Sequence, residues 1–391
     1  MLAVIAPGQG AQAPGLLAPW LDQPGAAERL SWWSAVTGLD LARLGTAADA
    51  TEIRDTAVAQ PLLLATGLLS AAALDLHDDT LADVYAGHSV GEITAATLAG
   101  SLSEEAALVF VRARGEAMAR SATAIETGMT AVLGGEETEV LTRLTELGLE
   151  AANRNGAGQL VAAGRLAALA ALAADPPGRA RLRPLPVAGA FHTDFMSGAR
   201  RELEGLAAGM PFADPDAHLL SNADGTLVSA GAALRERLVA QVTASVRWDL
   251  CLRTMSDLGV TGVIELAPAG TLSALVRREL PGVEVVALKT PADLPAAREL
   301  AAAHLHYVSD NSMPAWRVVV APAAGTFHRE QTTPGASVDA GAVLGQLRGR
   351  RDSATVTASY AGVLLEWLVE EGDPVSPGQP LARLHPQAVA W

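Results

Sequence analysis

Residues 87 to 92 read Gly87-His88-Ser89-Val90-Gly91-Glu92, which places a serine between two glycines. The stretch Ala82 to Ala86 predicts a short buried strand before it, and Glu92 to Leu98 predicts the start of an Ala-rich helix. A Gly-x-Ser-x-Gly turn at such a junction exposes the hydroxyl, although a glycine-rich turn with a capping serine has the same pattern. The functional interpretation makes Ser89 a covalent nucleophile, with amide N–H groups and the helix N-terminus facing a developing oxyanion.

Three other features supply the remaining parts of a serine-based site. The run Leu2 to Ala6 predicts a strand that ends in a glycine-rich loop, Pro7-Gly8-Gln9-Gly10-Ala11-Gln12, which can carry a second oxyanion donor. Arg114 lies 25 residues after the serine, within the predicted helix Ala106 to Ala119. His192 lies 103 residues after it, and histidine is the side chain whose ordinary pKa suits proton removal near neutrality.

Together these stretches resemble the malonyl-CoA:acyl-carrier-protein transacylases of fatty-acid and polyketide synthesis. The resemblance covers about residues 1 to 306, and the motifs occur in the family's order: PGQGAQ, GHSVGE, Arg114-Gly115, Asn155 before a glycine-rich turn, AFH, and Glu265-x-x-Pro268-x-Gly270. In that family a serine takes the malonyl group from coenzyme A as an ester and passes it to the phosphopantetheine thiol of the carrier protein. The resemblance therefore implies malonyl-CoA and an acyl carrier protein as partners, in either fatty-acid or polyketide synthesis.

The resemblance also implies the roles of individual residues. It makes Ser89 the nucleophile and His192 the base, and it places the oxyanion donors on the backbone N–H groups of Gln9 and Val90. In the family a main-chain carbonyl orients the imidazole, and the matching position here is Gln241. No Asp or Glu is therefore assigned to a catalytic triad.

Arg114 distinguishes this interpretation from an ordinary serine hydrolase. A guanidinium can take a carboxylate through two parallel hydrogen bonds, and malonyl differs from acetyl by having that carboxylate. A buried Arg left without its partner would penalise acetyl substrates. Arg112 points to a different side of the same predicted helix and is expected to be solvated.

Other residues near these motifs have a structural and a functional interpretation. Phe191 resembles the aromatic residue of malonyl-specific members, which favours an unbranched malonyl group. Asn155 is expected to face the active-site cleft, although turn formation at Asn155-Gly156-Ala157-Gly158 explains it nearly as well. His88 is interpreted as a partly buried shaping residue. For His192 the structural alternative is a satisfied buried histidine.

The composition is that of a soluble, cytoplasmic enzyme. Half of the 391 residues are apolar, and the single cysteine, Cys251, is expected to be a small buried residue and excludes an internal disulfide. The sequence has no CxxC motif or His/Cys cluster that would predict a zinc site. The N-terminal apolar run is too short for a signal peptide, and the apolar stretch Pro61 to Leu76 is interrupted and expected to be too short for a membrane span.

The net charge of −15 argues against nucleic acid or an anionic membrane as a partner. Acyl carrier proteins are usually acidic, so a docking surface would have to be a local basic patch. The candidates are two arginine clusters, each of which is otherwise solvated surface: Arg179, Arg181 and Arg183, or Arg200 and Arg201.

Alternating strands and helices predict an α/β fold for residues 1 to 306, with a large, mainly parallel sheet of the kind found in hydrolases. The predicted buried strands are Leu2 to Ala6, Ala82 to Ala86, Gly262 to Leu266 and Val283 to Leu288. Residues 127 to 187 break the pattern and predict a small α+β insertion. Its expected elements are strands at Met129 to Leu133 and Gln159 to Ala163, and helices at Glu137 to Leu147 and Leu166 to Ala173. The family resemblance implies a ferredoxin-like subdomain here, with the active site in the cleft beside it.

After a last predicted helix, about Pro295 to Tyr307, residues 307 to 315 have the composition of a linker. Residues 316 to 391 then contain an internal repeat with a period of 37. The repeat pairs Gly325 with Gly362, Gly335 with Gly372, Val338 with Val375, Gly341 with Gly378, Leu344 with Leu381, and Leu347 with Leu384. Short strands joined by Gly/Pro turns in each half predict an all-β flattened barrel of two halves.

This C-terminal segment resembles biotinyl and lipoyl carrier domains, which attach their cofactor to a lysine at the tip of the hairpin joining the halves. The matching position is taken to be Ser353, and the segment has no lysine, so covalent biotin or lipoate is not expected. The segment is then either a module that binds a protein partner or a domain that only stabilises the fold.

The sequence thus predicts a malonyl-CoA:carrier-protein transacylase with an unmodified lipoyl-like appendage and no cofactor. A serine hydrolase of acyl thioesters is the alternative within enzymes. A non-catalytic assembly subunit is the alternative of another class, and the intact set of Ser89, His192 and Arg114 argues against it.

Overall fold

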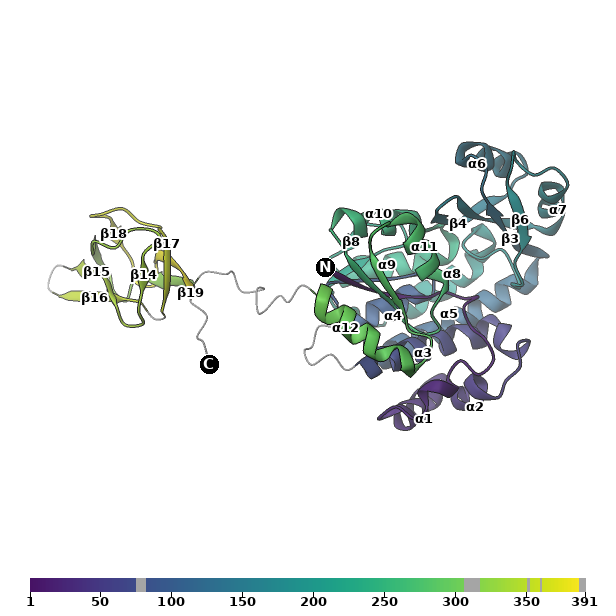
Figure 1. Cartoon of the computed structure of the whole chain (residues 1–391), viewed down its shortest axis with the longest axis horizontal. Coiled ribbons are helices and arrows are strands. Elements are labelled where there is room, and N and C mark those ends of the chain that lie inside the picture. Colours follow the sequence, from purple (N-terminus) through teal and green to yellow (C-terminus); the bar gives the residue numbers. More distant parts are fainter. Residues whose placement is uncertain (75–81, 306–316, 350–351, 359–360, 387–391) are drawn as a thin grey trace. The chain divides into compact units, whose positions relative to one another are not determined.

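The structure is a computed structural model that describes residues 1–74, 82–305, 317–349, 352–358 and 361–386 (Figure 1). The chain divides into two compact units, Met1–His306 and Tyr307–Trp391, and each is described by itself. The linker predicted at 307–315 lies outside the described residues.

The first unit is built on a six-stranded sheet with the strand order β11-β10-β1-β2-β7-β8. Neighbouring strands run parallel except β8, which is antiparallel to β7. The strands are β1 Leu2–Ala6, β2 Val84–Gly87, β7 His218–Leu220, β8 Leu227–Val228, β10 Gly262–Glu265 and β11 Glu284–Ala287. The predicted α/β domain with a mainly parallel sheet is confirmed, and its four predicted strands lie within two residues of the observed bounds.

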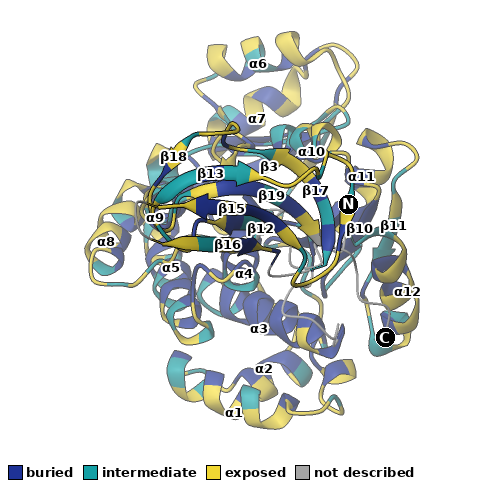
Figure 2. Ribbon diagram, turned by 90° about the vertical axis from the view of Figure 1, so that its left-hand side faces the viewer, coloured by how far each residue is buried: buried dark blue, intermediate teal, exposed yellow. Residues whose placement is uncertain are grey.

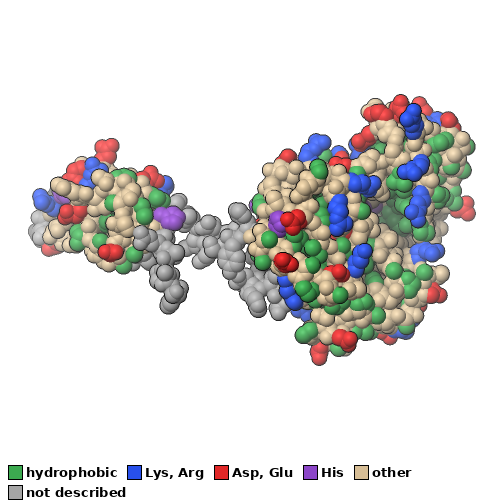
Figure 3. Space-filling model, in the orientation of Figure 1, with side chains coloured by type: hydrophobic (Ala, Val, Ile, Leu, Met, Phe, Trp, Pro, Cys, Tyr) green, Lys and Arg blue, Asp and Glu red, His purple; other side chains and the backbone are tan. Residues whose placement is uncertain are grey.

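The helices of this unit are α1 Ala26–Thr37, α2 Leu41–Thr46, α3 Thr56–Leu74, α4 Gly91–Leu98, α5 Glu104–Ala124, α8 Ser197–Ala207, α9 Gly231–Ala240, α10 Trp248–Asp257, α11 Thr271–Glu279 and α12 Leu294–His304. Most of them turn one side toward the core and the other toward solvent, whereas α3 and α4 are buried nearly all round (Figure 2). Over the face of the first unit that Figure 3 presents, acidic and basic side chains are interspersed. The surface ion pairs among them each contribute little to stability.

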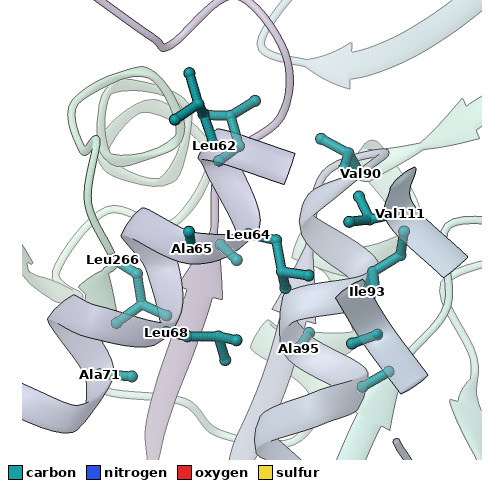
Figure 4. Close-up of a cluster of buried hydrophobic side chains, with 14 of the residues drawn as sticks. Leu62, Leu64, Ala65, Leu68, Ala71, Val90, Ile93, Ala95, Val111 and Leu266 are labelled. Carbon is teal, nitrogen blue, oxygen red and sulfur yellow. The ribbon is translucent and has the colours of Figure 1, made fainter. Parts of the chain in front are cut away.

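The middle of the core is formed by α3, α4 and α5 (Figure 4). Leu64 and Leu68 of α3 lie close to Ile93 of α4, and all three side chains are at most 3% exposed. Burial of such aliphatic side chains contributes about 1.5 to 3 kcal/mol each. This packing holds α4, and with it the turn that carries Ser89, against the rest of the unit.

Helix α3 is long and apolar enough to cross a membrane by length and composition alone. The expectation that this stretch is too short was wrong, because the helix begins at Thr56 and not at Pro61. However, 78% of its most apolar window is buried inside the unit, which is the position of a core helix.

The insertion predicted at 127 to 187 is a separate sheet with two helices, in the order β3-α6-β4-β5-α7-β6. Its elements are β3 Thr127–Leu133, α6 Glu137–Glu146, β4 Glu150–Gly156, β5 Gln159–Arg165, α7 Leu166–Ala174 and β6 Arg181–Pro184. The antiparallel order β6-β3-β5-β4 is that of a ferredoxin-like fold, as expected. The short strand β9, Val246–Arg247, joins β4 in parallel and so ties this subdomain to the large domain.

The second unit consists of two four-stranded sheets, β12-β19-β17-β14 and β16-β15-β13-β18. The strands are β12 Arg317–Val320, β13 Gly325–Arg329, β14 Ser337–Val338, β15 Val343–Arg348, β16 Ser353–Thr357, β17 Gly362–Trp367, β18 Pro374–Val375 and β19 Pro380–Pro386. The predicted all-β barrel of two halves is confirmed.

The sequence repeat of the second unit is also a structural repeat. Gly325 and Gly362 each begin a strand, and Leu344 and Leu381 are both fully buried in the core of the barrel. The turn glycines have matching positive φ angles, 90° at Gly335 and 88° at Gly372, which only glycine adopts without strain.

The prediction that Ser353 occupies the hairpin tip was wrong. Ser353 lies in β16 opposite Arg348 of β15, and the Gly349 N–H donates to the Asp352 carbonyl at 2.8 Å, so the chain reverses before Ser353. The two residues between Gly349 and Asp352 lie outside the described part of the chain, and both are arginine in the sequence. The segment still has no lysine, since the only lysine of the chain is Lys289.

Candidate active site

The turn between β2 and α4 holds Ser89 in a strained conformation, with φ at 55°. The flanking glycines are required by space. A Cβ atom at Gly87 would lie 2.0 Å from the backbone of Gly91, and one at Gly91 would lie 2.2 Å from the Ala6 carbonyl. The register of β1 against β2 pairs Ala6 with Gly87, so the loop after β1 lies beside the serine turn at the carboxyl edge of the sheet. This edge is where open α/β sheets bind ligands.

The Ser89 hydroxyl lies 2.7 Å from Nε2 of His192. The other ring nitrogen, Nδ1, lies 2.8 Å from the main-chain carbonyl of Gln241. Because a carbonyl oxygen only accepts, Nδ1 carries the proton and Nε2 is left as the acceptor for the serine proton. Burial, and next the nearby charge of Arg114, lower the pKa of His192 to about 3, so the imidazole is neutral at physiological pH.

Arg114 lies on α5 and is 1% exposed. Its guanidinium donates to Gln60 Oε1 at 2.7 Å, to Gln241 Oε1 at 2.7 Å and to the Ser89 hydroxyl at 3.2 Å. Within the described residues its side chain forms no ion pair. Burial lowers its pKa to about 10, which still leaves a cation at neutral pH. The site therefore holds a buried positive charge beside the Ser89 hydroxyl.

Arg112 is less solvated than expected. It donates to the Ala57 carbonyl at 3.0 Å and forms an ion pair with Glu116 at 2.6 Å. Its side chain is 26% exposed, and it does not reach the serine turn.

A cavity of about 240 Å³ opens onto Ser89 and His192. Its walls come from the serine turn, the loop after β1, α11 and the ferredoxin-like subdomain. Among the predicted site residues, Gln9, His88, Asn155 and Phe191 line it. The rest of the wall is largely apolar, with Met118, Met129, Ala131, Val161, Leu185, Val187, Leu272 and Leu275. The cavity therefore lies in the cleft between the two subdomains, and its largely apolar wall suits the carbon chain of an acyl group. Arg114 does not line the cavity, but its guanidinium donates to the Ser89 hydroxyl, which does.

Asn155 lies in β4 and is 6% exposed. Its Oδ1 accepts from Nε2 of His88 at 2.9 Å, and the centroids of the His88 and Trp248 rings lie 5.9 Å apart in an edge-on arrangement. Burial lowers the pKa of His88, so this ring is neutral. The pair links the serine turn of the large domain to the small subdomain across the cleft, which agrees with a shaping role for His88.

The expected oxyanion donors are main-chain N–H groups on either side of Ser89. In the described part of the chain, no hydrogen bond uses the N–H of Gln9 or of Val90. The Gln9 side chain donates to the Thr56 hydroxyl at 3.1 Å and so anchors its loop to α3. Both N–H groups therefore remain available to a bound carbonyl oxygen.

Three residues of the site have no counterpart among the sequence-based predictions. Asn222, which follows β7, accepts the Ser89 N–H at 2.7 Å and donates to the Gly87 carbonyl at 2.8 Å, so it holds both sides of the serine turn. Gln60 holds Arg114. Glu92 is the last residue of the serine motif, but the sequence predicts no role for its carboxyl group. Only the placement of Glu92 three residues after the serine was a signal in the sequence.

The two candidate basic patches differ in their surroundings. Arg200 is paired with Glu204 at 2.9 Å. Arg181 and Arg183 lie exposed on β6 and form no ion pair in the described residues. Leu185, the first residue after β6, lines the cavity. Among the described residues, no group of three or more His, Cys, Asp or Glu side chains is placed to hold a metal ion.

The fold and this constellation define an acyl-transferring enzyme, and the comparison with known families agrees. The chain belongs to the acyl transferase domain family, which residues 4–297 match. Residues 317–384 match a second family, described as biotin-requiring enzyme.

Individual relatives carry a more specific name. The malonyl CoA-acyl carrier protein transacylase of Mycobacterium tuberculosis is 53% identical over 297 residues, which covers 75% of this chain and 98% of the relative. The Bacillus subtilis protein of the same name is 33% identical, over 80% of this chain and 99% of its own length.

Solved structures agree with these relatives. The crystal structure of the M. tuberculosis enzyme matches with a TM-score of 0.74 at 52% identity, over 76% of this chain and 99% of that one. A malonyl-transacylase solved in complex with a type II PKS acyl-carrier protein matches with a TM-score of 0.72 at 27% identity, over 76% of this chain and 99% of that one.

Proposed function

We propose that this protein transfers the malonyl group from malonyl-CoA to the phosphopantetheine thiol of an acyl carrier protein, through a malonyl ester on Ser89. The observation that carries the proposal is the position of Arg114. Its guanidinium lies 3.2 Å from the nucleophile, is buried, and contacts only neutral groups. A malonyl ester on Ser89 would bring its free carboxylate to this cation, whereas an acetyl ester has no carboxylate to pair with it.

In the first half of the reaction, Nε2 of His192 accepts the Ser89 proton as Oγ attacks the thioester carbonyl of malonyl-CoA. The new C–O bond turns the carbonyl oxygen into an oxyanion, which the N–H groups of Gln9 and Val90 stabilise. As the C–S bond breaks, His192 returns the proton to the departing coenzyme A thiol. The product is a malonyl ester on Ser89 with a neutral imidazole.

In the second half, the thiol of the carrier protein takes the place of coenzyme A. Nε2 of His192 accepts its proton, the sulfur attacks the ester carbonyl, and Ser89 leaves with the proton that His192 returns. The Gln241 carbonyl keeps Nδ1 protonated throughout, so the same nitrogen serves in both halves. The Phe191 side chain at the cavity wall is proposed to leave room for an unbranched malonyl group, and Asn155 to shape the wall opposite.

A hydrolase of acyl thioesters would use the same nucleophile and base, with water in the second half. The largely apolar cavity wall and the relatives' transferase names favour a thiol acceptor. A non-catalytic assembly subunit would not need a hydrogen-bonded nucleophile and base with a neutral imidazole.

We also propose that the second unit carries neither biotin nor lipoate in the cell, because it has no lysine to form the amide bond. It is then a module that binds a protein partner or one that stabilises the fold. Mass spectrometry of the protein from its native cells tests this, and a mass increment equal to either cofactor would overturn it. The chain is proposed to act in the cytoplasm, where its substrates are made.

The experiment that separates transfer from hydrolysis follows both products. The protein is mixed with malonyl-CoA, with and without a holo carrier protein, and free malonate and malonyl-carrier are measured over time. We expect malonyl-carrier to form much faster than malonate. Equal release of malonate with and without the carrier protein would support the hydrolase, and no turnover of malonyl-CoA would support the non-catalytic subunit.

A further inference from the structure

Glu92 is a buried carboxyl group next to the site that the proposed mechanism does not use. It lies in the first turn of α4 and is 1% exposed. No Arg or Lys contacts it among the described residues. A buried carboxylate without an ion pair is costly unless its hydrogen bonds are well satisfied, so its presence needs an explanation.

Besides a hydrogen bond with the Ser221 side chain, the Glu92 carboxyl group accepts hydrogen bonds from two residues that hold the reactive groups. Its Oε2 accepts from Nε2 of Gln241 at 2.6 Å and from the main-chain N–H of Asn222 at 3.2 Å. Asn222 in turn fixes the backbone of Ser89, and the Gln241 side chain fixes Arg114. One carboxyl group therefore connects the serine turn with the guanidinium.

The connection through Gln241 depends on which way round its carboxamide lies. A carboxamide has a donating end and an accepting end, and only the accepting end can hold a guanidinium. Here Nε2 points to Glu92 and Oε1 points to Arg114. If the acceptor at Glu92 were lost, the carboxamide could turn over and present its NH₂ group to the guanidinium, which would then be displaced. Nε2 also donates to the Ser89 carbonyl and to Asn222 Oδ1, each at 3.2 Å, but these neutral acceptors at longer distances are weaker anchors than the Glu92 carboxyl group at 2.6 Å.

We propose that Glu92 is a positioning residue that fixes the orientation of the Gln241 carboxamide and thereby holds Arg114 where it can take a substrate carboxylate. Glu92 does not touch the reacting atoms. Through Arg114 it affects the selectivity for malonyl over acetyl groups. The inference rests on the proposed function, since it takes malonyl-CoA to be the substrate. Gln241 then has two separate roles, since its main-chain carbonyl orients His192 and its side chain orients Arg114.

The test compares malonyl and acetyl transfer in two variants of the full chain. Glu92→Met has a similar volume and no acceptor, whereas Glu92→Gln keeps an acceptor oxygen without the charge. For Glu92→Met we expect the ratio of malonyl to acetyl kcat/KM to fall about tenfold, mainly through a higher KM for malonyl-CoA, because a displaced Arg114 loses about one charged hydrogen bond. For Glu92→Gln we expect a ratio close to that of the wild type.

A double-mutant cycle shows whether Glu92 acts through Gln241. The side chain of Gln241 is removed by Gln241→Met, which keeps the main-chain carbonyl. If Glu92 acts through this side chain, the double variant loses no more selectivity than Gln241→Met alone. Thr94→Ala, at a buried residue of the same helix outside this hydrogen-bond set, is the control for loss of packing, and it should leave the ratio unchanged.

An unchanged ratio in Glu92→Met, or fully additive losses in the cycle, would overturn the inference. If Glu92→Met does not fold, Glu92→Leu and Gln241→Met carry the same comparison, and an unchanged ratio in the folded variant has the same meaning. A wild-type protein that does not prefer malonyl over acetyl would instead contradict the proposed function, so the two failures are distinguishable.

Discussion

Ser89 and His192 meet with 2.7 Å between Oγ and Nε2, and both residues have a positive φ, 55° and 61°. Left-handed backbone is costly for residues with a side chain, so each end of this hydrogen bond is held in a strained conformation. Asn222 secures the serine end, and the Gln241 carbonyl secures the histidine end. The proposed nucleophile and base are therefore held together by hydrogen bonds from the surrounding protein.

Arg114 should determine the choice of acyl group. The guanidinium forms no ion pair among the described residues, so it is free to pair with the malonyl carboxylate. Arg114→Ala should therefore raise the transition-state free energy of malonyl transfer by about 2 to 4 kcal/mol, seen as a lower kcat/KM, and leave acetyl transfer nearly unchanged. Steady-state rates with the two CoA esters measure this. Arg112→Ala is the matched control, two positions along the same helix, and should affect both substrates little. An equal loss for both esters in Arg114→Ala would mean that Arg114 is structural.

His192 should remain neutral well below the ordinary histidine range. Burial and the Arg114 charge lower its pKa to about 3, and a base with a lowered pKa stays unprotonated until the pH falls near that value. We therefore expect the ring nitrogen chemical shifts of His192 in NMR spectra to show no protonation between pH 8 and pH 5. Titration of the His192 ring near pH 6.5 would contradict the described environment.

Glu92 should make stability depend on pH. Burial raises its pKa to about 7 against an unfolded value of 4.5, so the folded state holds the proton more tightly. The resulting stabilisation is complete below pH 4.5 and is lost as the pH rises through 7, by up to about 3 kcal/mol. The free energy of unfolding of the wild type relative to Glu92→Gln should thus fall between pH 5 and pH 8. Unfolding followed by the helical circular dichroism signal measures it, and a difference independent of pH would show that Glu92 does not titrate there.

The second unit should be dispensable for the chemistry. The M. tuberculosis relative is matched over 98% of its length by 75% of this chain, so the acyl transferase domain is a complete protein elsewhere. A chain that ends at residue 306 should remain folded and transfer malonyl to a saturating free carrier protein at close to the full-length rate. A folded truncation that has lost this transfer would show that the second unit takes part in the reaction.

The sequence predicted the central strands well because a parallel sheet covered on both faces requires short, continuous apolar runs. Leu2–Ala6 is such a run and was predicted to the residue. The strands β4 and β6 were missed, because Glu150–Gly156 and Arg181–Pro184 are rich in polar residues and their places come from pairing in the small subdomain. The hairpin position of Ser353 was misplaced because the repeat relates residues of the two halves to one another, and only the pairing of β15 with β16 locates the turn that joins them.

The site shows the same division. Ser89, His192 and Arg114 were proposed from motifs, since their chemistry restricts the residue types, and the structure brings the three side chains together. Asn222 and Gln60 were not found, because an amide that supports another residue through hydrogen bonds has no motif of its own. Their roles follow from contacts between residues up to 135 positions apart.

The central claim is the malonyl ester on Ser89, and intact-protein mass spectrometry after brief mixing with malonyl-CoA tests it most directly. We predict one added malonyl group, located on the peptide that contains Ser89, removed by a holo carrier protein and absent in Ser89→Ala. A malonyl adduct of equal yield in Ser89→Ala, or none in the wild type while malonyl-carrier still forms, would contradict the account.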